Sequence, residues 1–159
     1  MTLESFYSIL SGICFGLIGL WWNVVDKRPD WLTNPNLRRL AGAVYASFLI
    51  PGVMALGAQI GGDNKLVWRS VFVLAALLGI YYNARLLAQM RKSKQGGFPV
   101  RTRWLVILTY AVVLVLGAFP ELATPTGLKP IQVEAFLLCL IVLTGHGIAW
   151  EMMTLNPGT

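Results

Sequence analysis

Charged residues are scarce in this sequence. Asp, Glu, Lys and Arg make up 13% of its 159 residues, whereas hydrophobic residues make up 56%. Average soluble proteins contain roughly 25% charged residues. A soluble fold of this composition would expose large apolar patches, so the composition excludes an ordinary soluble protein and predicts a membrane protein. The formal net charge of +6 is then explained by orientation in the membrane, and nucleic acid is not expected as a partner.

Histidine and cysteine are almost absent, with one His and two Cys. Cys14 and Cys139 both fall inside apolar segments, and two such thiols make neither a disulfide framework nor a metal site. The sequence also contains no HExxH motif, no GxSxG motif and no glycine-rich phosphate loop. We therefore expect no enzyme, no catalytic residues and no metal site.

Five long apolar segments, separated by short polar loops, fill most of the chain. Most of them approach or exceed the roughly 20 residues that cross about 30 Å of hydrocarbon at 1.5 Å per residue. We predict an all-α, polytopic integral membrane protein whose single transmembrane domain, residues 1–159, is a bundle of five helices. The expected helices cover approximately residues 3–25, 35–60, 64–90, 103–119 and 131–153. Asn34-Pro35 is typical of a helix start, and Gly61-Gly62 of a helix end.

Basic residues are unevenly divided between the loops. Loops one and three, with their flanking residues, hold most of them: Lys27, Arg28, Arg38, Arg39, Arg85, Arg91, Lys92, Lys94, Arg101 and Arg103. Loops two and four hold only Lys65, Arg69 and Lys129. The positive-inside rule therefore predicts that the N-terminus lies outside and the C-terminus in the cytoplasm. We expect a multi-pass protein of the cell inner (plasma) membrane; a thylakoid or other internal membrane is the alternative.

The first segment has a face of small and polar residues. Gly12 and Gly16 form a GxxxG pair, and Gly19 and Asn23 continue the same face at steps of three or four. Such a face is typical of tight helix packing, within the chain or between copies. The alternative is the lining of a pore or cavity whose cytoplasmic mouth is marked by Asn23 and Asp26.

The first, third and fifth segments carry polar residues toward their cytoplasmic ends. These residues are Asn23, Asp26, Asn83, Arg85, His146 and Glu151. If the three helices are neighbours, Arg85 can pair with Asp26 or Glu151, and Asn83 can bond His146. Polar groups inside a membrane are candidates for a functional site, and a network that only locks the bundle is equally compatible with them.

His146 lies between Gly145 and Gly147, which leave room above its ring. This arrangement suits an axial ligand of haem or chlorophyll, and it equally suits close helix packing with an interhelical hydrogen bond. A haem held by two histidines would need a second copy of the chain.

Five helices leave little room for a wide path through one chain. The leading hypothesis is a small membrane protein that forms a homo-oligomer in the lipid bilayer and passes an ion or small solute. Its path would form between chains, with the small, polar face of the first segment at the centre. The polar lining would consist of Asn23, Asp26, Asn83, His146 and Glu151. The alternative is a non-transporting subunit that packs against other membrane subunits of a larger complex and holds a haem or chlorophyll through His146, or no cofactor.

Overall fold

The computed structural model describes residues 2–62, 64–92 and 98–154, with side chains described for residues 2–62, 64–88 and 101–154. These residues contain helices and no strand. The elements are α1 (Leu3–Asp26), α2 (Pro29–Thr33), α3 (Pro35–Gly61), α4 (Lys65–Lys92), α5 (Phe98–Ala118), the 3-10 helix η1 (Pro120–Thr126) and α6 (Pro130–Thr154).

Five of these helices, α1, α3, α4, α5 and α6, are long and apolar enough to cross a membrane. The prediction of an all-helical chain with five such helices is confirmed, and these helices indicate a multi-pass membrane protein. Two details differ from the expectation. Helix α5 begins at Phe98 rather than near residue 103, and the loops after α1 and α5 contain the short helices α2 and η1.

The ends of the second long helix follow its local sequence. The Asn34 side chain accepts hydrogen bonds from the backbone N–H groups of Asn36 and Leu37, which have no partner inside the helix. Pro35 occupies the first helical position, where its missing N–H loses nothing. The helix ends at Gly61, and Gly62 has a positive φ of 48°, a conformation that favours glycine.

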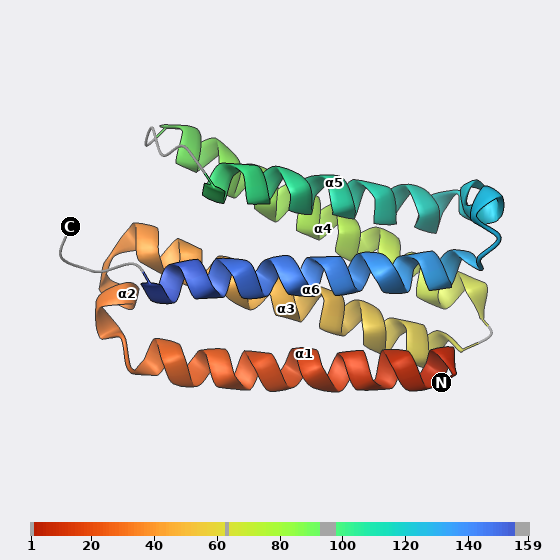
Figure 1. Ribbon diagram of the computed structural model, residues 1–159, viewed down its shortest axis with the longest axis horizontal. Helices are drawn as coiled ribbons and strands as arrows, with labels where there is room; N and C mark the ends of the chain where they lie inside the picture. Colours follow the sequence, from red (N-terminus) through yellow and green to blue (C-terminus); the bar gives the residue numbers. More distant parts are fainter. Residues whose placement is uncertain (1, 63, 93–97, 155–159) are drawn as a thin grey trace.

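Helix α3 is the centre of the bundle (Figure 1). It packs against α1, α4 and α6, while α5 packs against α4 and α6. The start of α1 and the end of α6 lie at opposite ends of the bundle in Figure 1, as an odd number of antiparallel long helices requires. Among the described residues, α4 approaches neither α1 nor α6 along the backbone. Along their backbones the first, third and fifth long helices are therefore not all close neighbours, although the ring of Phe72 on α4 meets that of Tyr7 on α1 edge-on, at 6.3 Å between centroids.

Glycines allow the closest approaches between helices. A Cβ atom at Gly52 would lie 3.0 Å from the Cβ of Cys14, and one at Gly145 would lie 2.5 Å from the Oγ of Ser47. At Gly57 and Gly79 a Cβ atom would collide with Val71 and with the ring of Tyr110. Small residues thus bring the backbones together, as is typical of membrane helices.

The glycines that the sequence singled out do not take part in this packing. Gly12, Gly16 and Gly19 are exposed, and a Cβ atom at each would meet nothing within 4 Å. Of the two alternatives, packing within the chain and packing between copies, the first is not seen for these glycines among the described residues. Helix periodicity identifies a face of small residues but does not tell what covers that face. Packing of this face between copies stays a prediction.

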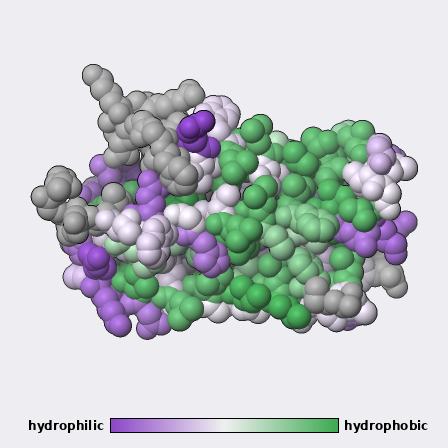
Figure 2. All heavy atoms as spheres, viewed as in Figure 1, coloured by the Kyte–Doolittle hydropathy of each residue, from purple (hydrophilic) through white to green (hydrophobic). Residues whose placement is uncertain are grey.

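Hydrophobic side chains cover the middle of the bundle, and hydrophilic ones gather toward its ends (Figure 2). One end carries α2 together with the exposed or half-buried cations Lys27, Arg28, Arg38, Arg39, Arg85 and Arg101. We call this the basic end. The other end, which we call the distal end, carries η1 and the start of α6.

Candidate functional site

A buried guanidinium lies near the basic end, between α4, α5 and α6. The side chain of Arg103 is only 3% exposed. Its Nη1 donates a hydrogen bond to the Oδ1 of Asn83 at 3.1 Å, and the Nδ2 of Asn83 donates to the carbonyl oxygen of Gly79 at 2.8 Å. Tyr82 and the half-buried Glu151 lie within electrostatic range of the guanidinium. We call Arg103, Asn83, Tyr82 and Glu151 the Arg103 cluster.

A carboxyl group without a partner lies at the distal end of the core. Glu134, in the second turn of α6, is 0% exposed, and among the described residues neither of its carboxyl oxygens finds a hydrogen-bond partner. Tyr7 is within electrostatic range, but its hydroxyl donates to the carbonyl oxygen of Ile131 at 2.6 Å. A buried polar group normally has a partner because leaving it without one is unfavourable. Glu134 is therefore the strongest functional candidate in the interior.

Tyr110 lies between these two places in the core. Its side chain is 1% exposed, and its hydroxyl has no hydrogen-bond partner in the part of the chain that the structure describes. The ring packs on Gly79, the residue whose carbonyl accepts from Asn83. Tyr110 follows Arg103 by two helical turns on α5, about 10 Å along the axis, and so lies on the same face. The bundle interior therefore holds ionisable or hydroxyl groups near the distal end, in the middle and near the basic end.

Of the six polar residues that the sequence grouped together, two enter the Arg103 cluster. Asn83 and Glu151 do so, although Asn83 bonds Arg103 and not His146. Asn23, Asp26, Arg85 and His146 are exposed on the surface. Asn23 donates to the carbonyl oxygen of Gly19 in its own helix. The bond between Asn83 and His146 and the pairing of Arg85 with Asp26 or Glu151 depended on the three helices being neighbours, and the described residues form neither, since the α4 backbone lies close to neither α1 nor α6.

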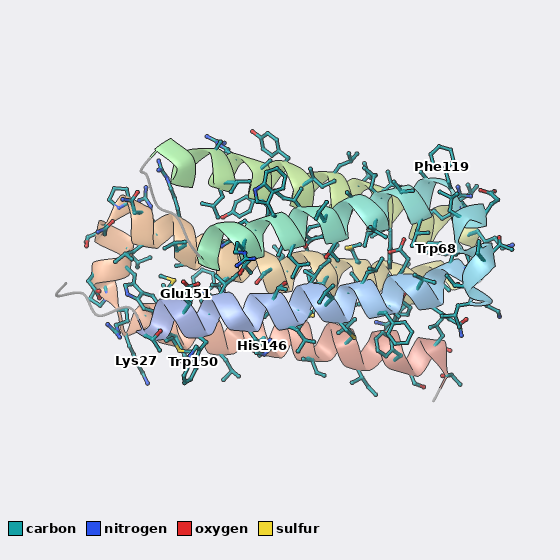
Figure 3. The ribbon with its side chains drawn as sticks, turned by 45° about the horizontal axis from the view of Figure 1, so that its top comes forward. Lys27, Trp68, Phe119, His146, Trp150 and Glu151 are labelled. Carbon is teal, nitrogen blue, oxygen red and sulfur yellow. The ribbon has the colours of Figure 1, made fainter. Side chains whose placement is uncertain are left out.

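The imidazole of His146 contacts a backbone carbonyl of its own helix and an aromatic ring of α3. Its Nδ1 lies 2.9 Å from the carbonyl oxygen of Val142, and its ring meets Phe48 edge-on at 5.2 Å between centroids. If Nδ1 carries the proton that it shares with this carbonyl, Nε2 keeps its lone pair. In Figure 3, His146 lies part way along α6, between the distal end, marked by Trp68 and Phe119, and the basic end, marked by Lys27, Trp150 and Glu151. Within the part of the chain that the structure describes, no group of three or more metal-binding side chains occurs.

Reasoning from the sequence missed Glu134, Arg103 and Tyr110 as interior groups. From the sequence, Arg103 belongs to the loop charges that set orientation, because it lies at the start of an apolar segment. A usable signal existed for Glu134, since it is an acid one turn inside a long apolar segment. Nothing in the sequence marks Tyr110, because a tyrosine in an apolar segment is ordinary.

A scan against protein-family models and searches of curated proteins and of solved structures each found no match for this chain.

Proposed function

We propose that the protein passes protons, or another small cation, across a membrane through the interior of its bundle, with Glu134 as the binding group. The observation that carries this proposal is the complete burial of Glu134 with both carboxyl oxygens free. A carboxyl group binds protons and small cations reversibly, and buried acids mark proton and ion pathways in membrane proteins. An acid with both oxygens free keeps its binding capacity for a transported ion.

The spacing of the interior groups supports a path along the bundle. Glu134 and Glu151 are 17 residues apart on α6, which is about 25 Å at 1.5 Å per residue. This separation approaches the roughly 30 Å of hydrocarbon that a path must cross. Tyr110 supplies a free hydroxyl between Glu134 and the Arg103 cluster. The path proposed here lies inside one chain, in place of a pore between chains lined by α1.

Flux into liposomes tests the proposal. Purified protein is reconstituted with a pH-sensitive dye inside the vesicles, and a potassium gradient with valinomycin supplies the driving potential. We expect proton flux from the wild type, a loss of at least about tenfold in Glu134→Gln, and unchanged flux in Glu121→Gln. Glu121 is the matched control because it is an exposed glutamate of η1 at the distal end.

Other results of this assay would contradict the proposal in distinct ways. Wild-type flux equal to that of protein-free vesicles, for protons and for sodium, would rule out transport. Flux that survives in Glu134→Gln but is lost in Asp26→Ala would instead favour the pore between chains, because Asp26 is exposed on α1.

We also propose that copies of the chain associate through the exposed glycine face of α1. Gly12, Gly16 and Gly19 leave open space where a second helix backbone could approach. The test is the oligomeric mass of the detergent-purified protein, which should fall to that of a monomer in Gly16→Leu. A monomeric wild type would end this part of the proposal.

The second candidate function is that of a membrane-complex subunit that holds a haem or chlorophyll through His146. It is favoured by the contact between Nδ1 and the Val142 carbonyl, because a histidine that binds a metal usually donates its other ring N–H to such an acceptor. His146 is exposed, so a pigment would lie on the outside of the bundle. A visible absorption band in the purified protein that disappears in His146→Ala would support this function, whereas a colourless protein purified from its native membrane would contradict it.

A further inference from the structure

Two arginines from different helices meet in one recess at the basic end. The recess has a volume of about 200 Å³ and is lined by Arg39 of α3 and by Tyr81, Tyr82, Arg85 and Leu86 of α4. Tyr82 and Leu86 pack against the buried Ala43, so one side of the recess belongs to a small hydrophobic cluster.

The charges of Arg39 and Arg85 are not balanced by the described residues that line this recess. None of the five lining residues is acidic. Within the described part of the chain, neither Arg39 nor Arg85 makes a hydrogen bond or an ion pair. Two guanidinium groups that share a recess repel each other unless an anion lies between them. The described residues therefore provide this recess with no negative partner.

Along the helices, the recess lies at the level expected for the headgroup layer of a bilayer. Arg39 lies in the second turn of the candidate span Pro35–Gly61, and Arg85 in the last turn of the candidate span Lys65–Ala88. Both are therefore near the end of the apolar helix stretch, where the long arginine side chain reaches toward the headgroup layer. Tyrosine is also enriched at this level of a bilayer.

We propose that this recess binds a phosphate group, held by the guanidiniums of Arg39 and Arg85. Arginine presents a planar set of N–H donors that matches phosphate oxygens, and two arginines from two helices can clasp one phosphate. Basic pockets between transmembrane helices are a recognised kind of site for anionic lipid headgroups. The same chemistry would also accept inorganic phosphate, and the experiment separates the two sources.

The test compares lipid retention by native mass spectrometry of the detergent-purified protein titrated with phosphatidylglycerol or with phosphatidylcholine. A parallel arm measures the thermal unfolding temperature with and without inorganic phosphate. The variant is Arg39→Gln/Arg85→Gln, and the matched control is Arg38→Gln/Arg101→Gln. The control removes the same charge from exposed arginines that do not line the recess.

For a lipid ligand, we expect phosphatidylglycerol to bind the wild type and the control in preference to phosphatidylcholine. The Arg39/Arg85 variant should bind it about tenfold or more weakly, as expected when two arginines near the surface are lost. For a soluble ligand, inorganic phosphate should raise the unfolding temperature of the wild type and the control but not of the variant.

Equal behaviour of variant and control in both arms would overturn the proposal, as would no binding of either probe. The single variants Arg39→Gln and Arg85→Gln, each with an intermediate loss, provide the same comparison if the double variant does not fold.

Discussion

Within the described residues, the amide of Asn83 is the one side chain that accepts a hydrogen bond from Arg103. Arg103 is 3% exposed, and Asn83 accepts from its Nη1 while donating to Gly79 on its own helix. Removing the amide leaves a buried cation short of an acceptor, and a hydrogen bond to a charged group is worth about 1.5–3 kcal/mol. The amide is therefore a structural requirement of the Arg103 cluster whatever the cluster does.

Asn83→Ala is predicted to lower the free energy of unfolding by about 2 kcal/mol. Asn23→Ala is the matched control, because Asn23 is exposed and bonds only to its own helix at Gly19. It should change the stability by no more than about 0.5 kcal/mol. The measurement is unfolding in mixed detergent micelles followed by circular dichroism. Equal effects of the two substitutions would mean that the bond between Arg103 and Asn83 contributes nothing to stability.

At the scale of the helices, α3 and α4 approach closely where Gly57 faces Val71. A Cβ atom at Gly57 would come within 2.5 Å of a methyl group of Val71 and 2.8 Å of its Cβ. The branched valine cannot swing away, since its χ1 angle in a helix is almost fixed. A side chain at residue 57 must therefore push the two helices apart.

Gly57→Ala is predicted to destabilise the protein by about 1–3 kcal/mol, the usual effect of overpacking. Gly147→Ala should do the opposite, with a gain of about 0.5–1 kcal/mol, because alanine favours a helix interior and a Cβ atom there meets nothing within 4 Å. Thermal unfolding in detergent checks both signs. If Gly57→Ala were stabilising instead, α3 and α4 would be farther apart at this position than the structure shows.

At the scale of the whole molecule, the two ends of the bundle differ in charge. Exposed or half-buried cations gather at the basic end, whereas the distal end carries few. We propose that the basic end faces the cytoplasm, because basic residues in short loops resist translocation. This orientation would place Glu134 near the outer surface and the Arg103 cluster near the inner one.

Accessibility of introduced cysteines tests this orientation. In a background with Cys14 and Cys139 replaced by alanine, Lys27→Cys places a thiol at the basic end and Thr126→Cys places one at the distal end, both at exposed positions. A membrane-impermeant maleimide added to intact bacterial cells should label residue 126 and leave residue 27 unlabelled until the cells are opened. The reverse pattern would show the opposite orientation, and labelling of both would show mixed insertion.

The sequence by itself determined the number, kind and approximate extent of the long helices. Each of these properties is local: a stretch of apolar residues long enough to cross hydrocarbon must satisfy its own backbone, and a helix does so. The cap at Asn34 and the end at Gly61 are equally local, since they depend on a few adjacent residues. A helical pattern also identified the small face of α1 and the polar end of α4.

Only the tertiary structure decided which faces meet. The period of a helix tells which residues share a face, but it does not tell which helix covers that face, because membrane helices lack the strong water-driven burial that orients the helices of soluble proteins. Gly12 and Gly16 therefore point outward while Gly57 and Gly79 make the close contacts. For the same reason Asp26 and His146 lie on the surface, and Glu134 and Arg103 lie inside.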